Sequence, residues 1–196
     1  EYRRVNVEGT LNLARQAAAV GVQRFIFLST IGVIGNISER PFREEDDPNP
    51  AEWYAQSKWQ AEQGLWDIQR ATGMELVVIR PPLAYGPGAP GNFGSLIRWV
   101  QRGVPLPLGA IHNQRTLIAL DNLVDLIIRC IDHPAAANDL FLAGDAQDLS
   151  TSELLRAVAR AMGKPTRLVP VPASLLMLGA TLLGKRAMAL RLLGSL

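Results

Sequence analysis

Two side chains suited to proton transfer stand four residues apart, in the sequence Tyr54-Ala-Gln-Ser-Lys58. On a helix, residues i and i+4 lie on one face, so this spacing presents a phenol and an ammonium to the same pocket. The positive charge favours phenolate and is expected to lower the pKa of Tyr54 from its ordinary value near ~10. Such a phenol can act as general acid or base on a hydroxyl or carbonyl. Any solvated amphipathic helix can also contain this spacing, so the pair needs support from its surroundings.

Two hydroxyl residues precede this pair, at the end of an apolar run. Residues 24–30 are rich in β-forming side chains, predict a buried strand and end in Ser29-Thr30. Proteins with parallel sheets place their sites at the carboxyl ends of strands. Thr30 is therefore the candidate catalytic hydroxyl, and Ser29 is the alternative if the register differs by one residue.

Strands and helices alternate along the chain. Strands that alternate with helices of ten or more residues predict a parallel sheet with helices on both faces, so the fold class is α/β. The elements become shorter and less regular after Pro81, which indicates a second, smaller lobe. The predicted helices are residues 5–20, 53–71, 92–102, 121–132, 150–162 and 172–193, the predicted strands are residues 24–30, 75–80, 116–120 and 140–143, and residues 81–91 are expected to be irregular.

Composition narrows the classes of function. The formal charge of +2 is small and the Lys and Arg residues are scattered, so no nucleic-acid partner is expected. Cys130 is the single cysteine, which excludes an intrachain disulfide and fits a reducing cytoplasm. The apolar, uncharged residues 171–184 are fewer than the ~20 residues of a membrane span. They predict a buried or partner-facing helix, and no membrane partner.

Five motifs in order resemble the extended short-chain dehydrogenase/reductase family, the family of NAD-dependent epimerases and dehydratases, in its UDP-glucose 4-epimerase-like branch. The resemblance covers residues 5–125. The motifs are Asn6-x-x-Gly9-Thr10, Ser29-Thr30 followed by Val33-x-Gly35, Tyr54-x-x-x-Lys58, Arg80-Pro81 continuing to Tyr85-Gly86-Pro87-Gly88, and Arg115 followed by an apolar strand and Asp121.

The resemblance implies a role for each matching residue. Thr30 and Tyr54 match the catalytic hydroxyl and the catalytic tyrosine. Lys58 matches the catalytic lysine that also hydrogen-bonds the nicotinamide ribose. Asn6 and Pro81 are expected near the cofactor, together with Tyr54 and Lys58. Asn92 and Arg115 are expected at the substrate, together with Thr30, and would hold its diphosphate. No metal site is expected. The planar fork of an arginine suits phosphate oxygens. A helix N-cap for Asn92 and a surface position for Arg115 are the structural alternatives.

The implied function is epimerisation at C4 of a UDP-sugar through transient nicotinamide-dependent oxidation, in surface polysaccharide synthesis. Two departures argue against a plain UDP-galactose epimerase: Leu83 replaces a frequent asparagine, and Ile34 replaces a tyrosine in the Val-Tyr-Gly turn. The motifs look more like bacterial enzymes for UDP-N-acetylated or deoxy sugars. A 4-ketoreductase of a UDP-4-keto-6-deoxy-sugar and a steroid-type reductase are the alternatives, as is a binding module that keeps the fold without chemistry.

The family's dinucleotide loop, Gly-x-x-Gly-x-x-Gly, does not occur in this sequence. In such a loop the pyrophosphate lies on a helix N-terminus. We therefore expect the chain to be a fragment that lacks the first βα units of a Rossmann-like, doubly wound sheet. Residues 1–81 would be the C-terminal part of the NAD-binding domain, and residues 82–196 mostly the substrate-binding lobe, with some segments returning to the sheet.

The complete protein is expected to use NAD, or NADP, and to be cytoplasmic. The helices at residues 5–20 and 53–71 are the pair with which family members build a dimer through a four-helix bundle. Both are rich in alanine, and Trp59 and Trp66 lie seven residues apart on one stripe of the second helix. A homodimer of the complete protein is therefore expected.

Overall fold

The chain forms two compact units, each assembled from segments distant in the sequence. The structure, a computed structural model, describes residues 1–87 and 91–195, apart from the side chains of residues 91, 92, 187, 188 and 191. Unit 1 contains Glu1–Asn36, Phe42–Pro82 and Leu120–Gly144, and unit 2 contains Ile37–Pro41, Leu83–Ala119 and Asp145–Leu196.

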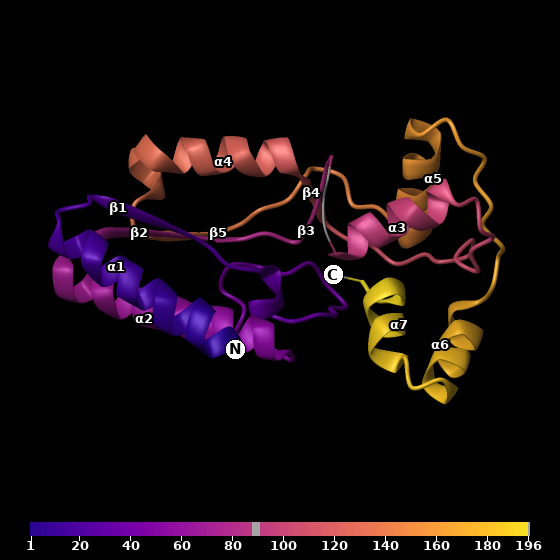
Figure 1. The fold of residues 1–196 in the computed structure, drawn as a ribbon, viewed down its shortest axis with the longest axis horizontal. Coiled ribbons are helices and arrows are strands. Elements are labelled where there is room, and N and C mark those ends of the chain that lie inside the picture. Colours follow the sequence, from indigo (N-terminus) through magenta and orange to yellow (C-terminus); the bar gives the residue numbers. More distant parts are fainter. Residues whose placement is uncertain (88–90, 196) are drawn as a thin grey trace. The chain divides into compact units, whose positions relative to one another are not determined.

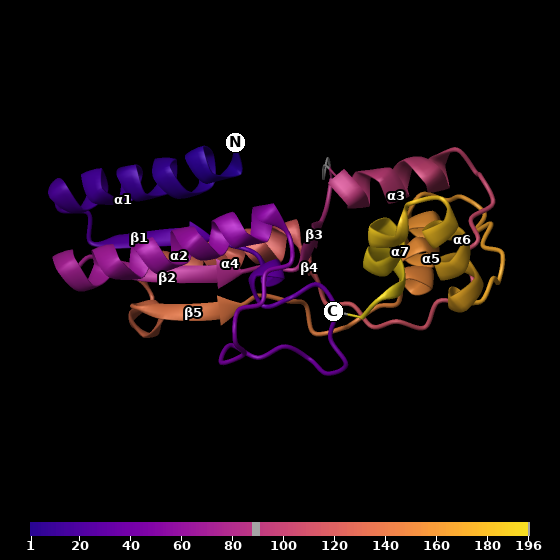
Figure 2. The same cartoon turned by 90° about the horizontal axis from the view of Figure 1, so that it is seen from below.

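A three-stranded parallel sheet is the centre of unit 1. Its strands are β1 (Arg24–Leu28), β2 (Glu75–Arg80) and β5 (Asp139–Leu142), in the order β1-β2-β5. Figure 2 shows these strands side by side in that order. Helices α1 (Thr10–Ala19) and α2 (Trp53–Thr72) cover one face, and α4 (Leu120–Asp132) covers the other (Figure 1). This partial sheet with helices on both faces confirms the predicted α/β class.

The helices of unit 1 follow their sequence signals closely. Chain-reversing glycines follow α1 and α2: Gly21 and Gly73 have φ of 80° and 73°, a region that favours glycine. Before α1, residues Arg3–Gly9 form a π-helix, η1, where the sequence predicted an ordinary helix from residue 5. Helix α4 is followed by a short 3₁₀ helix, η3 (Pro134–Ala136).

The core of unit 1 lies between the helical layer and the sheet. It is built from small and large apolar residues that fit together, namely Ala14 from α1, Ala61, Leu65 and Ile68 from α2, Phe27 from β1, Leu76 and Val78 from β2, and Met74. On the other face, Arg24 joins β1 to the end of α4. Its Nη1 donates to the carbonyls of Cys130 and His133 at 2.7 and 2.9 Å, and its Nε donates to Glu75 at 2.8 Å. Cys130 is 3% exposed, and burial raises the pKa of its thiol.

In its described residues, unit 2 combines a two-stranded parallel sheet with four helices. The strands are β3 (Leu83–Tyr85) and β4 (Leu117–Ala119), and the helices are α3 (Gly91–Gln101), α5 (Thr151–Ala161), α6 (Ala173–Leu182) and α7 (Arg186–Leu193). Strand β3 corrects the expectation that residues 81–91 are irregular throughout: its backbone pairs with β4 despite the surrounding prolines. The single helix predicted at residues 172–193 is two helices, separated at Gly184 with φ of 67°.

The core of unit 2 gathers around α3 and α5, with Phe93, Leu96 and Val100 facing Leu154 and Leu155. The predicted capping box of α5 is present: the Ser150 hydroxyl accepts from the Glu153 N–H at 3.1 Å, and the Glu153 carboxylate accepts from the Ser150 N–H at 2.8 Å. In the described part of the chain, no helix is long and apolar enough to cross a membrane.

Candidate functional site

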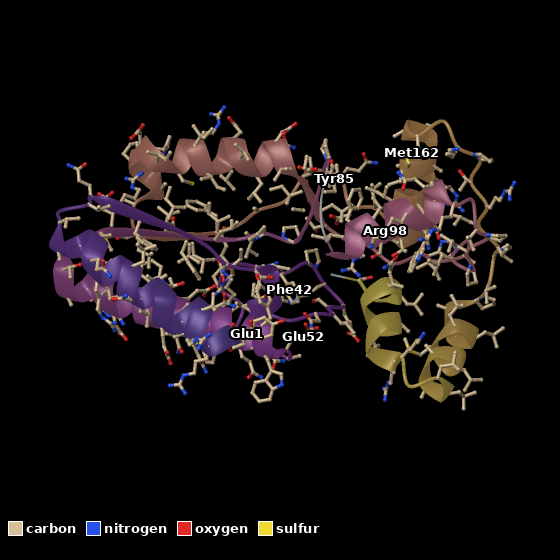
Figure 3. The ribbon with its side chains drawn as sticks, in the orientation of Figure 1. Glu1, Phe42, Glu52, Tyr85, Arg98 and Met162 are labelled. Carbon is tan, nitrogen blue, oxygen red and sulfur yellow. The ribbon has the colours of Figure 1, made fainter. Side chains whose placement is uncertain are left out.

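Helix α2 positions Tyr54 and Lys58 in its first two turns. The buried side of the helix begins at Ala55 and continues through Ala61 to Ile68, which fixes its rotation on the sheet. Glu52, labelled in Figure 3, lies directly before the helix. Tyr54 is 40% exposed, so its phenol stays accessible while its helix is anchored.

Lys58 is held at the carboxyl end of β1. Its Nζ donates to the Leu28 carbonyl at 2.9 Å and lies 4.6 Å from the ring centroid of Phe27. Burial lowers the pKa of Lys58, and the nearby Glu62 carboxylate opposes this by favouring the ammonium. A lysine held in this way has a fixed place beside the strand end that carries the candidate hydroxyls.

The pKa of Tyr54 corrects one expectation. The spacing to Lys58 predicted a lowered pKa, but burial raises it, with a further contribution from the Tyr2 phenol. The Tyr2 and Tyr54 rings meet edge to face with centroids 5.8 Å apart. The physical reason is that desolvation of the phenolate outweighs any stabilisation by Lys58, whose ammonium contacts Leu28 and Phe27 instead.

The two hydroxyls after β1 differ in their surroundings. Ser29 is 4% exposed, and its Oγ donates to the Glu62 carboxylate. Thr30 is half-buried, and its Oγ1 accepts from the Gly32 N–H at 3.2 Å. The Ser29 hydroxyl is therefore buried and hydrogen-bonded in the interior, whereas Thr30 is partly exposed.

A buried ion pair lies beneath these groups, and sequence reasoning missed it. Arg80 and Glu62 are 5% and 2% exposed, and Arg80 Nη2 donates to Glu62 Oε2 at 2.6 Å. The pair, together with Ser29, ties the ends of β1 and β2 to α2. Two signals could have revealed it: Glu62 lies four residues after Lys58 on the same stripe, and Arg80 ends an otherwise apolar strand.

The other two residues expected near the cofactor, Asn6 and Pro81, also belong to unit 1. Asn6 lies within η1, and its Nδ2 donates to Ser57 Oγ at 3.0 Å, which in turn donates to the Tyr54 carbonyl at 2.7 Å. Pro81 is buried, and its carbonyl accepts from the Ile31 N–H at 3.0 Å. Unit 1 therefore contains Asn6, Thr30, Tyr54, Lys58 and Pro81.

The residues expected at the diphosphate belong to unit 2. Arg115 exchanges two backbone hydrogen bonds with Leu149, both 3.1 Å long, and burial lowers the pKa of its guanidinium. Asn92 falls in α3, but its side chain lies outside the described residues. Tyr85, labelled in Figure 3, comes from β3 and donates to the Asp145 carboxylate at 2.8 Å.

Comparison with known proteins agrees with the geometry. The chain belongs to the NAD dependent epimerase/dehydratase family, whose profile matches residues 1–144. It is 48% identical to a UDP-glucose 4-epimerase of Vibrio cholerae over 198 residues, which are 100% of this chain and 60% of that protein. The chain thus spans about three fifths of that relative's length.

Two further relatives show how widely the similarity extends. The chain is 31% identical to the N-acetyl-α-D-glucosaminyl-diphospho-ditrans,octacis-undecaprenol 4-epimerase of Escherichia coli O157:H7, over 91% of this chain and 54% of that protein. The Thermus thermophilus UDP-glucose 4-epimerase, solved as a complex with NAD, superposes with a TM-score of 0.71 at 25% identity, covering 89% of this chain and 64% of that one.

Proposed function

We propose that the complete protein to which this chain belongs is an NAD-dependent 4-epimerase of a UDP-sugar, acting in surface polysaccharide synthesis in the cytoplasm. The observation that carries the proposal is the arrangement at the end of β1. Helix α2 holds Lys58 on the Leu28 carbonyl, one turn from the accessible Tyr54 phenol, and Thr30 lies two residues after Leu28. The similarity to named 4-epimerases supports it.

Each candidate residue of unit 1 has a role in the proposed reaction. Tyr54 exchanges a proton with the 4-oxygen of the sugar, and the Thr30 hydroxyl holds that oxygen. The donors present fit the ribose end of a dinucleotide, because Lys58 and Tyr54 offer an ammonium and a phenol from one helix face. Asn6 and Pro81 would line the same region. Bound nicotinamide supplies reversible hydride transfer at C4.

Activity of the complete protein tests this directly. With NAD, it should convert UDP-glucose or UDP-N-acetylglucosamine to the 4-epimer, and the same mixture should form from either epimer. Proton NMR of the anomeric signals follows both directions. Reduction of a 4-keto sugar without epimerisation would assign the protein to the ketoreductases and reject the proposal.

Unit 2 is proposed as the substrate-binding unit, in which Arg115 and Asn92 contact the diphosphate. Replacing Arg115 by Ala should weaken UDP binding by about 10- to 150-fold, the equivalent of ~1.5–3 kcal/mol for charged hydrogen bonds. Arg115→Lys should recover only part, because an ammonium lacks the planar fork. NAD affinity should not change.

Isothermal titration with UDP in the presence of NAD measures this. Equal UDP affinity in the wild type and in Arg115→Ala would exclude Arg115 as a phosphate ligand. A wild-type protein that binds no UDP would instead favour the steroid-type alternative, in which an apolar pocket replaces the phosphate site.

The Escherichia coli relative supports a second candidate substrate. Its name describes a 4-epimerase of an undecaprenol-linked sugar diphosphate. The ring chemistry is the same in both cases, so Tyr54, Thr30 and Lys58 would keep their roles. Offering the complete protein UDP-N-acetylglucosamine and the lipid-linked sugar in parallel identifies the one that it epimerises.

A further inference from the structure

Helix α6 is apolar on every side, yet no residue of it is buried. The sequence predicted a buried or partner-facing helix here. Leu175, Leu178 and Leu182 are 58%, 59% and 80% exposed, and their spacing of three and four residues puts them on one stripe. A helix without a polar face normally lies inside a protein or against another apolar phase.

The other side of α6 attaches it to unit 2. Leu176 packs against the core formed by α3 and α5, so the helix is anchored and the leucine stripe faces away from that contact. Figure 1 shows α6 and α7 joined by a short turn. In that turn Leu183 is 75% exposed, and Lys185 and Arg186 are exposed beside it. An exposed apolar patch rimmed by polar residues marks an interaction site.

The segment of the sequence that contains this patch carries charge of one sign. All 18 acidic residues of the chain lie at or before Glu153, whereas 7 of its 20 cationic residues follow it. Residues 154–196 therefore carry +7, although the whole chain carries only +2. At the patch itself, Lys185 and Arg186 are exposed next to the leucines, which fits an anionic partner with an apolar layer.

Two other occupants fit less well. A second copy of the chain would bring the same positive segment against itself, because a two-fold interface pairs a surface with its own copy. A nucleic acid would engage the cations but would leave the leucine stripe in water. An anionic bilayer satisfies both features, since leucines enter the boundary of the acyl chains and cations remain at the lipid phosphates.

We propose that the α6 surface, formed by Leu175, Leu178, Leu182, Leu183, Lys185 and Arg186, docks the complete protein onto an anionic lipid bilayer. At ten residues, α6 would lie in the interface rather than span it. The sequence predicted no membrane partner because it contains no apolar span. A peripheral contact needs none, since a short exposed stripe and neighbouring cations are sufficient.

Co-sedimentation of the complete protein with vesicles tests the proposal. The protein should bind vesicles of equimolar phosphatidylcholine and phosphatidylglycerol, and should bind phosphatidylcholine alone much more weakly. Leu182→Asp should weaken binding by about tenfold or more, because the variant replaces an apolar side chain with a carboxylate that does not enter the apolar layer. Val20→Asp is the matched control: Val20 is also 80% exposed but lies in unit 1, and this change should leave binding unaltered.

Lys185→Glu separates charge from apolar contact. It should weaken binding by about fivefold for each unit of charge removed, and added salt should reduce the difference. Three results would overturn the proposal: no binding to either vesicle, equal binding by Leu182→Asp and Val20→Asp, or tighter binding to duplex DNA that Leu182→Asp does not alter. None of these measurements requires turnover, so their outcome is independent of the proposed reaction.

Discussion

A phenol and an ammonium on one helix face do not by themselves form an activated pair. In this chain Lys58 contacts a backbone carbonyl and a phenylalanine ring, while burial raises the pKa of Tyr54. In the proposed reaction, the function of Tyr54 therefore depends on what a bound substrate and cofactor add to its surroundings.

Replacing Tyr54 by Phe should lower kcat by a factor of ~10²–10⁴, the range for a positioned acid or base. Substrate affinity should change little, because the hydroxyl acts mainly in the transition state. Steady-state kinetics of the complete enzyme measures both quantities. Tyr85→Phe is a suitable control, since it removes a phenol that contacts Asp145 in the other unit. Wild-type turnover by Tyr54→Phe would remove Tyr54 from the mechanism.

Lys58 should titrate below the ordinary lysine value, and Glu62→Gln should lower its pKa further by removing a nearby negative charge. Between the folded and unfolded pKa values of Lys58, the unfolded chain binds more protons. The contribution of Lys58 to stability therefore rises with pH through this window.

Carbon NMR of labelled lysine side chains follows the titration, with Lys58→Met identifying the signal. Glu62→Gln also leaves Arg80 without its buried counter-ion, so a thermal melt should accompany it to show that the variant is folded. A Lys58 signal that titrates identically in both folded proteins would show that Glu62 does not act on this ammonium.

The placement of the candidate residues could largely be predicted from the sequence, because they occur in short motifs. Tyr54 and Lys58 are four residues apart on one helix, and Thr30 lies two residues after a recognisable strand, although the strand was predicted to continue to residue 30 and ends at Leu28. The Glu62–Arg80 pair was missed because its partners lie far apart in the sequence and meet only when α2 packs on β2. The pKa of Tyr54 depends on burial and on Tyr2, and neither can be read from a four-residue spacing.

At the scale of elements, two helical glycines differ in the space available for a side chain. A Cβ on Gly64 of α2 would lie 2.6 Å from Leu11 Cδ1, whereas a Cβ on Gly179 of α6 would meet nothing within 4 Å. Gly179→Ala should therefore stabilise the protein by the usual ~0.5–1 kcal/mol. Gly64→Ala should lose that gain, because α1 and α2 must move apart or Leu11 must change rotamer.

Urea unfolding of the two variants provides the comparison. If Gly64→Ala is stabilised as much as Gly179→Ala, then the close approach of α1 and α2 does not constrain that position.

The elements with strong local signals were predicted well, and those set by pairing were not. Strand β2 has its predicted bounds, because it is a continuous apolar run between turn residues. Strand β3 was missed because three residues among prolines become a strand only by pairing with β4. The π-helix η1 has no sequence signature that distinguishes it from the start of α1.

For the molecule as a whole, we propose that the complete protein is a homodimer built by α1 and α2. On α1, Leu13 is 60% exposed, whereas its neighbour Ala14 is fully buried. Sedimentation at micromolar concentration should give twice the monomer mass, and Leu13→Asp should shift the equilibrium towards monomer. Arg15→Ala, which removes an exposed polar side chain from the same helix, should have little effect. A wild-type protein that sediments as a monomer would exclude the dimer.

The buried Cys130 allows local opening of unit 1 to be measured by thiol labelling. As the single cysteine of the chain, it lies where α4 meets the Arg24 side chain, and burial keeps its thiol protonated. Thiolates, rather than thiols, react with alkylating reagents. Labelling of Cys130 under native conditions should therefore proceed only when α4 separates from the sheet. The rate of labelling therefore measures how often α4 opens locally, and the measurement needs neither an introduced probe nor a bound ligand.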